Sequence, residues 1–147
     1  MTATNHGLFG AVIAVTLSTN PIVAIMIAPL SHFLLDAIPH FGVPENALRS
    51  RKFFVILALD AFVAVVSTII LAVAWSQIWF LVIVCAFLAA SPDLMWIYYE
   101  YMHPELKHKH LIPKFHSWIQ WSQTNKGLVI ELAWYAILMS ILIIKSR

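Results

Sequence analysis

Charged residues and cysteines are both scarce in this chain. Only 11% of its 147 residues are charged and 61% are hydrophobic, so the mean hydropathy of +0.84 lies far from that of a soluble protein. The single cysteine, Cys85, excludes a disulfide within one chain and is expected to be a small core side chain. We therefore expect residues 1–147 to form one all-α integral membrane domain, with no soluble domain and no nucleic-acid partner.

Long apolar runs account for the low charge content. Residues 53–75 are 23 residues with one charge, Asp60, and at ~1.5 Å per residue such a helix crosses a ~30 Å hydrocarbon layer. Residues 78–101, interrupted by Ser91-Pro92-Asp93, and residues 128–144 form two further runs. The sequence therefore predicts three transmembrane helices.

The N-terminal part predicts a tight helical hairpin. Residues 7–18 and 21–38 are separated only by Thr19-Asn20, where Asn20 suits a helix cap and Pro21 the first helical turn. Whether this hairpin crosses the membrane fully or re-enters on the same side is open. Because no Lys or Arg precedes the apolar run, we expect the segment to stay in the mature protein.

Basic residues gather on one predicted side of the membrane. If the hairpin enters and returns, segments 42–52 and 102–126 lie on the side of the N-terminus, and the positive-inside rule places that side in the cytoplasm. Residues 113–124 predict a short interfacial helix on this side, with Phe115, Trp118 and Ile119 on one face. Seven basic residues lie on this side and two on the other: Arg49, Arg51, Lys52, Lys107, Lys109, Lys114 and Lys126, against Lys145 and Arg147.

One polar stretch interrupts the second arm of the hairpin. His32, Asp36 and His40 are spaced four residues apart, which places His32 and Asp36 on one face of a helix and carries His40 to the same side where Pro39 loosens the helix. Imidazole and carboxylate so arranged can bind one cation. The alternative is that they only form hydrogen bonds with neighbouring helices.

Three further acids lie near the same end of their predicted spans: Asp60, Asp93 and Glu131. An acid inside a membrane span costs at least ~2.5 kcal/mol, so it is normally paired or faces a cavity. The three therefore indicate a shared polar cavity at one depth. Individually, Asp60 could neutralise a histidine, Glu131 could satisfy the start of its own helix, and Asp93 could lie at a kink made by Pro92.

Several motifs carry a resemblance to a known family. The chain resembles small bacterial integral membrane proteins classed as metal-dependent hydrolases, and is similar to those described as LexA-binding inner-membrane hydrolases. More remotely, His32-x-x-x-Asp36 followed by Pro39-His40 resembles the metal-ligand helix of zinc-dependent phospholipase C. The chain lacks the family's His-Arg-Gly-x-Thr-His signature. The motifs are Asn5-His6-Gly7, Leu30-Ser31-His32-Phe33-Leu34-Leu35-Asp36-Ala37-Ile38-Pro39-His40, Ser91-Pro92-Asp93 and Phe115-His116.

This resemblance implies a helical metal site that hydrolyses a phosphoester. Zinc is the cofactor that we expect first, with manganese or iron as rivals, because such a cation activates water and neutralises charge on a phosphoryl oxygen. The ligands carried over from the family are His6, His32, Asp36, Asp93 and His116.

A site at the level of the cytoplasmic headgroups suits a phospholipid or polyprenyl-phosphate substrate. In such a site Asp60 or Glu131 would orient a ligand histidine or act as base. We count His40 with these two acids as candidate catalytic residues.

A non-catalytic interpretation explains the same polar residues. The chain could be a membrane interaction or assembly protein, alone or as an oligomer, whose polar cluster is structural. A transporter is disfavoured because polar groups should then continue through the membrane, whereas the far half offers only Ser76 and Gln77 at its edge. The choice between enzyme and interaction protein is open at the level of sequence.

Overall fold

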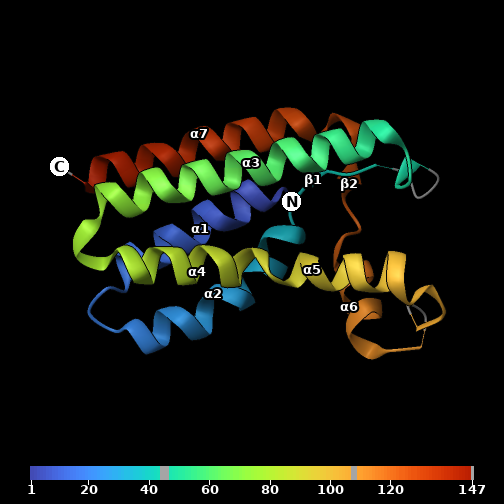
Figure 1. The fold of residues 1–147 in the computed structure, drawn as a ribbon, viewed down its shortest axis with the longest axis horizontal. Coiled ribbons are helices and arrows are strands. Elements are labelled where there is room, and N and C mark those ends of the chain that lie inside the picture. Colours follow the sequence, from blue (N-terminus) through green and yellow to red (C-terminus); the bar gives the residue numbers. More distant parts are fainter. Residues whose placement is uncertain (44–46, 107–108, 147) are drawn as a thin grey trace.

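The computed structural model describes residues 1–43, 47–106 and 109–146, and helices make up most of it (Figure 1). Two short strands, β1 (His40–Phe41) and β2 (Gln123–Thr124), pair in parallel, with His40 beside Gln123. The α-helices are α1 (Ala3–Thr16), α2 (Pro21–Asp36), α3 (Arg51–Ala74), α4 (Trp79–Ala90), α5 (Pro92–Ile97), α6 (Leu111–Ile119) and α7 (Leu128–Lys145), and the strands are β1 (His40–Phe41) and β2 (Gln123–Thr124).

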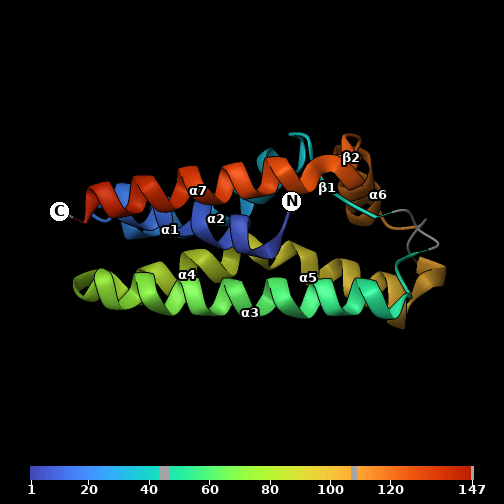
Figure 2. The same ribbon diagram turned by 90° about the horizontal axis from the view of Figure 1, so that it is seen from above.

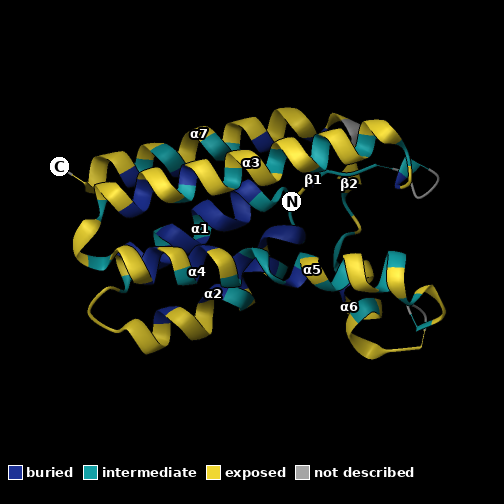
Figure 3. Cartoon of the chain, viewed as in Figure 1, coloured by how far each residue is buried: buried dark blue, intermediate teal, exposed yellow. Residues whose placement is uncertain are grey.

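Helix α1 is the centre of the fold. It contacts α2, α3, α4 and α7, and its residues are buried on every side, as the dark blue ribbon in Figure 3 shows. Gly10 allows this packing, because a Cβ atom there would lie 2.3 Å from the carbonyl oxygen of Cys85 on α4. A small residue at such a crossing lets two helix backbones approach closely.

The outer helices expose apolar surface. Among the residues of α3, only Ser67, Leu71 and Ala72 are buried, and α7 likewise leaves most of its apolar side chains exposed. In the described part of the chain, three helical segments are long and apolar enough to cross a membrane: Arg51–Ala74, Ser76–Met102 and Leu128–Lys145. The prediction of an all-α chain with three such segments is therefore confirmed.

The N-terminal helices form the predicted hairpin, with α1 and α2 running in opposite directions (Figures 1 and 2). Pro21 is at the first turn of α2, whereas the Asn20 side chain makes no capping hydrogen bond. Helix α1 begins at Ala3, four residues before the predicted start, because Thr2 caps it by accepting from the Asn5 amide. The hairpin thereby brings Asn5 and His6 into the helix.

The predicted interfacial helix is shorter than expected. Helix α6 ends at Ile119, and Gln123–Thr124 turn into β2, which pairs with β1. The Gln123–Thr124 backbone cannot both continue a helix and pair with a strand, so the helical prediction for residues 120–124 was wrong. Lys107 and Arg147, which were counted among the basic residues, lie outside the described residues.

Pro92 divides the second span into α4 and α5. Proline lacks an N–H group, so the Leu88 carbonyl loses its usual helical donor; the Ser91 hydroxyl donates to it instead, at 2.9 Å. The Leu88 carbonyl therefore does not need the Asp93 side chain as a partner. Asp93 lies in the first turn of α5.

Candidate metal centre

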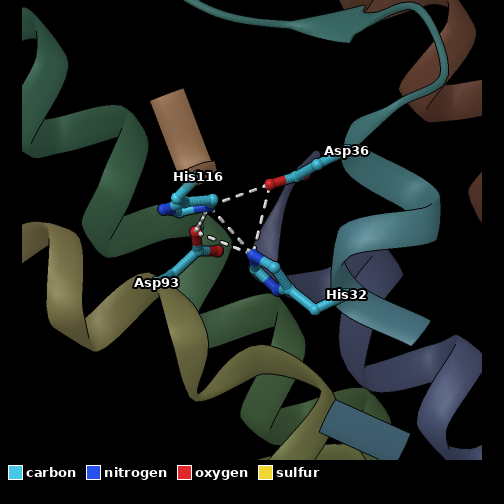
Figure 4. Close-up of side chains that lie close together, drawn as sticks. All are labelled: His32, Asp36, Asp93 and His116. Carbon is cyan, nitrogen blue, oxygen red and sulfur yellow. Dashed lines mark hydrogen bonds and ion pairs between the residues drawn. The ribbon is translucent and has the colours of Figure 1, made fainter. Parts of the chain in front are cut away.

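Four ligand-type side chains converge where α2, α5 and α6 meet: His32, Asp36, Asp93 and His116 (Figure 4). One nitrogen or carboxylate oxygen from each lies within 4.8 Å of those of the others. Helix α2 supplies two of them one turn apart, at the spacing that the sequence indicated. The other two come from segments distant in the sequence.

The distances between these atoms suit a single cation. His32 Nε2 and His116 Nε2 are 3.2 Å apart, and Asp36 Oδ2 lies 3.2 Å from the first and 3.0 Å from the second. Asp93 Oδ1 is farther away, at 3.6 Å and 4.0 Å from the same two nitrogens. Ligands bound at ~2.0–2.1 Å around a tetrahedral ion lie about 3.3 Å apart. The residues present therefore fit a small divalent cation.

The protonation of His32 favours the same interpretation. Its Nδ1 lies 3.0 Å from the Ala89 carbonyl oxygen, which can only accept, so Nδ1 carries the hydrogen. In a neutral ring Nε2 then carries a lone pair and no hydrogen, and this lone pair faces the Asp36 carboxylate. Two acceptors this close need a cation between them, either an added proton or a metal ion. A metal-binding histidine typically has its second nitrogen held by a carbonyl or carboxylate in this way.

Asp36 has further partners around the cluster. His6 Nε2 lies 3.1 Å from Oδ1, and the His6 ring stacks on that of His32 with centroids 3.9 Å apart. Gln120 donates from Nε2 to Oδ2 at 3.1 Å, and the Met1 amino group contacts Oδ1. The Asp36 side chain is fully buried. His6 thus supports Asp36 directly, whereas the described four-residue cluster does not include it.

Gln120 and the Ala89 carbonyl were missed in the sequence analysis. Gln120 lies one helical turn after His116, so its spacing was a usable signal once His116 was a ligand candidate. The Ala89 carbonyl carries no signal in the sequence, because any residue type supplies the same backbone group.

Asp60 lies at the N-terminus of α1. Its carboxylate accepts from the amides of Ala3 at 2.8 Å and Thr4 at 3.2 Å, and from the Thr4 hydroxyl at 2.6 Å. A carboxylate here binds otherwise unpaired amide groups and the positive end of the helix dipole. The geometry thus favours a structural role over the catalytic role that we predicted.

Glu131 binds the same end of α1. It accepts from the Thr2 amide at 3.1 Å, the Thr2 hydroxyl at 2.8 Å and the Asn5 side-chain amide at 2.6 Å. The Phe41 amide adds a fourth contact at 3.2 Å. Glu131 therefore satisfies the start of α1 and not, as the sequence suggested, that of its own helix.

His40 is buried in β1, apart from the four-residue cluster. Its Nδ1 lies 2.7 Å from the Ile38 carbonyl oxygen, and its Nε2 has no hydrogen-bond partner among the described residues. Burial lowers the pKa of His40 below its ordinary value, because the charged imidazolium loses its hydration. A catalytic role for His40 stays a prediction.

A largely apolar cavity of about 1100 Å³ adjoins the cluster and is partly open to the outside. Asp93 and His116 line it together with one side of α3. The Asp93 side chain is 32% exposed, whereas that of His32 is fully buried. Because the cavity is partly open, molecules from outside can enter it.

Comparison with models of protein families, with curated proteins and with solved structures finds no match to this chain. The family resemblance noted from the motifs thus stays a prediction.

Proposed function

We propose that this chain is a metal-dependent hydrolase that cleaves a phosphoester of a lipid or lipid-linked substrate at the cytoplasmic leaflet. The observation that carries the proposal is the convergence of His32, Asp36, His116 and Asp93, at separations that suit one divalent cation, on the wall of an apolar cavity. Zinc is the first candidate, with manganese or iron as alternatives.

Each side chain of the cluster has a role in this proposal. His32, Asp36 and His116 would hold the cation from the buried side, and Asp93 would complete the set from the cavity side, where it is exposed. The Ala89 carbonyl would keep the His32 ring in place, while His6 and Gln120 would hold the two oxygens of Asp36. Such supporting hydrogen bonds typically set the orientation of metal ligands.

The reaction would be a simple hydrolysis. The oxygen of a water molecule adds to phosphorus, the P–O bond of the ester breaks, and the leaving alcohol takes up a proton. The bound cation would activate the water and neutralise charge on the phosphoryl group. Asp93 is the carboxylate of the cluster that lines the cavity, so we assign to it the contact with the entering water or leaving alcohol.

The membrane arrangement in this proposal has the cluster at the cytoplasmic surface. The α1–α2 hairpin would enter the membrane beside the three candidate spans, and α6 would lie at the headgroup level. Its exposed residues support that position, because Leu111 (83% exposed), Phe115 and Trp118 are large and apolar while His116 points inward. The predominance of basic residues on this side supports the cytoplasmic orientation.

A direct activity assay tests the proposal. The purified chain, reconstituted in anionic vesicles with zinc or manganese, is assayed for phosphate or phosphorylated headgroup released from phosphatidic acid, phosphatidylglycerol and a polyprenyl phosphate. Chelation should abolish release and added metal should restore it. The absence of metal-dependent release from the whole panel would reject the proposal.

A second candidate is a non-catalytic membrane interaction or assembly protein. One observation favours it: His6, His116, Gln120 and the Met1 amino group all contact Asp36, so its carboxylate is well satisfied by protein groups alone. In that case the cluster holds α1, α2 and α6 together, and chelation should leave every property of the folded protein unchanged.

A further inference from the structure

The cavity beside the cluster extends well beyond it along α3. Its wall on α3 includes Ala61, Ala64 and Thr68, and its wall on α4 includes Ile83, Ala86 and Ala90. We call this part of the cavity, from Ala61 to Ile69 on α3 and from Ile83 to Ala90 on α4, the far arm. It leads from Asp60 and Asp93 toward the connection between α3 and α4.

The far arm offers no unpaired polar group to a ligand. Among the described residues that line the far arm, Thr68 has the polar side chain. Its hydroxyl already donates to the Ala64 carbonyl at 2.8 Å. The remaining lining side chains are alanine, valine, isoleucine and phenylalanine. A phosphate or sugar would therefore lose its hydration in the far arm without compensation, whereas hydrocarbon would not.

The position of the far arm agrees with hydrocarbon. Both of its walls belong to segments long and apolar enough to cross a membrane, Arg51–Ala74 and Ser76–Met102. The nine steps from Asp60 to Ile69 rise ~14 Å along α3, and all of these residues lie inside the first of the two segments. The far arm therefore lies at the depth of lipid hydrocarbon.

We infer that the far arm binds one hydrocarbon chain of a membrane phospholipid whose phosphate lies beside Asp93 and His116. The inference rests on the proposed function for the position of the phosphate, since both residues belong to the cluster and line the same cavity. The chain would enter from the surrounding bilayer through the open side of the cavity. The far arm would thus select substrates by the length of this chain, while the cluster acts on the headgroup.

Photo-crosslinking tests the position of the chain directly. The full chain in a maltoside detergent is incubated with an alkylphosphonate that carries a diazirine at the end of its alkyl chain, and crosslinked peptides are identified by mass spectrometry. A phosphonate is used because its P–C bond resists hydrolysis. Crosslinks should lie in residues 61–69 and 83–90, and not on outward positions such as Val73 and Ile144, which are 73% and 72% exposed.

Competition adds a test of chain length. Hexadecylphosphonate should suppress these crosslinks at a concentration at least ~100-fold lower than butylphosphonate, because each methylene buried in the arm strengthens binding. Crosslinks spread evenly over the outward faces, or equal competition by the two phosphonates, would overturn the inference.

A variant and a matched control complete the design. Ala64→Phe should lower far-arm crosslinking about tenfold, because the phenyl ring fills space that the chain needs. Ala74→Phe, on an exposed residue of the same helix that does not line the cavity, should leave it unchanged. If Ala64→Phe does not fold, Ala61→Leu fills the same arm more gently and should lower crosslinking in the same direction. Equal crosslinking in a folded arm-filling variant and the control would reject the inference.

The outcome separates this inference from the proposed function. Loss of hydrolysis across the lipid panel, with far-arm crosslinking retained, would leave a lipid-binding chain without catalysis and would support the inference.

Discussion

Two pairs of acids lie near the start of α1 but face different kinds of partner. Asp60 and Glu131 accept hydrogen bonds from amide, hydroxyl and side-chain amide groups at the start of α1. Asp36 and Asp93 instead face the Nε2 atoms of two histidines. Every partner of the first pair brings a hydrogen. Asp36 also accepts from Gln120 and the Met1 amino group, but it and Asp93 share two histidine nitrogens that carry a lone pair in the ligand-competent tautomer.

This difference separates a structural role from a metal-binding one. Negative charge at Asp60 and Glu131 is balanced by donors and by the positive end of a helix, so no ion is needed there. Asp36 and Asp93 lie around two histidine nitrogens that can act as acceptors, and a cation bound among these four groups would pair with both carboxylates. Substitutions that remove charge from one pair at a time should therefore have distinct effects.

The largest effect is expected for Asp36→Asn. The amide keeps the size of the side chain but loses the anionic ligand, so metal-dependent phosphoester hydrolysis should fall by more than ~100-fold, beyond the range seen for supporting residues. Initial rates at saturating zinc or manganese measure this. The matched substitution Asp60→Asn should keep most activity per folded molecule, and an equal loss in both variants would remove the distinction between the pairs.

Asp60→Asn should act mainly on stability. The amide can no longer accept charge-assisted hydrogen bonds from Ala3 and Thr4 on both oxygens, and we expect a loss of ~2–3 kcal/mol in the free energy of unfolding. Equilibrium unfolding in mixed detergent micelles measures the change. A shift below ~0.5 kcal/mol, typical of surface substitutions, would show that Asp60 does not hold α1.

Both pairs depend on the position of α1, which Gly10 sets. In Gly10→Ala the new Cβ would lie 2.3 Å from the Cys85 carbonyl oxygen, and overpacking of this kind costs ~1–3 kcal/mol. Gly7→Ala is the control, because its Cβ would be 3.8 Å from the nearest atom, an ordinary contact. The same unfolding experiment should show a loss only for Gly10→Ala, and equal stability of the two variants would contradict the close helix packing.

Asp93→Asn should have a smaller effect on hydrolysis than Asp36→Asn. Asp93 is farther from the two nitrogens and is partly exposed to the cavity, so an amide oxygen or a water could replace its carboxylate. We expect a loss of about tenfold, at the lower end of the range for residues that support a metal site. Steady-state kinetics would contradict the geometry if Asp93→Asn proved more damaging than Asp36→Asn.

His40 belongs to neither pair and should give a small dependence of stability on pH. Its folded pKa is lowered from the unfolded value of 6.5 by burial, so the unfolded chain binds the proton more readily. Above pH 6.5 His40 is neutral in both states and does not reduce stability. Below pH 6.5 the unfolded chain takes up the proton first, so the free energy of unfolding falls by at most ~1.4 kcal/mol per pH unit. Unfolding of the wild type and of His40→Phe across this range isolates the effect, and parallel curves would exclude it.

Much of the fold could be predicted because membrane helices carry strong local signals. The apolar runs around Asp60 and after Gly127 give the spans by length alone, and the spacing of His32 and Asp36 gives their common face. The hairpin followed from Asn20-Pro21, although its first helix begins earlier than predicted. These inferences use only residues close together in the sequence.

The partners of the acids could not be predicted in the same way. Asp60 and Asp93 both appear as single acids in apolar runs, and only the packing of α1 against α3 and of α2 against α4 sends one to amide groups and the other to histidines. The end of α6 was missed for a similar reason, because β2 pairs with a strand more than 80 residues earlier in the chain. Long-range packing leaves no periodic pattern in a single sequence.

The most direct test of the account is the metal content of the purified chain. Wild type, Asp36→Asn and Asp60→Asn are loaded with zinc or manganese, freed of excess metal, and analysed by elemental mass spectrometry, with X-ray absorption to give ligand distances. The account predicts about one ion per chain, at ~2.0–2.2 Å from nitrogen and oxygen ligands, in the wild type and in Asp60→Asn but not in Asp36→Asn. A folded wild-type chain that retains no metal, or equal metal in all three proteins, would contradict it.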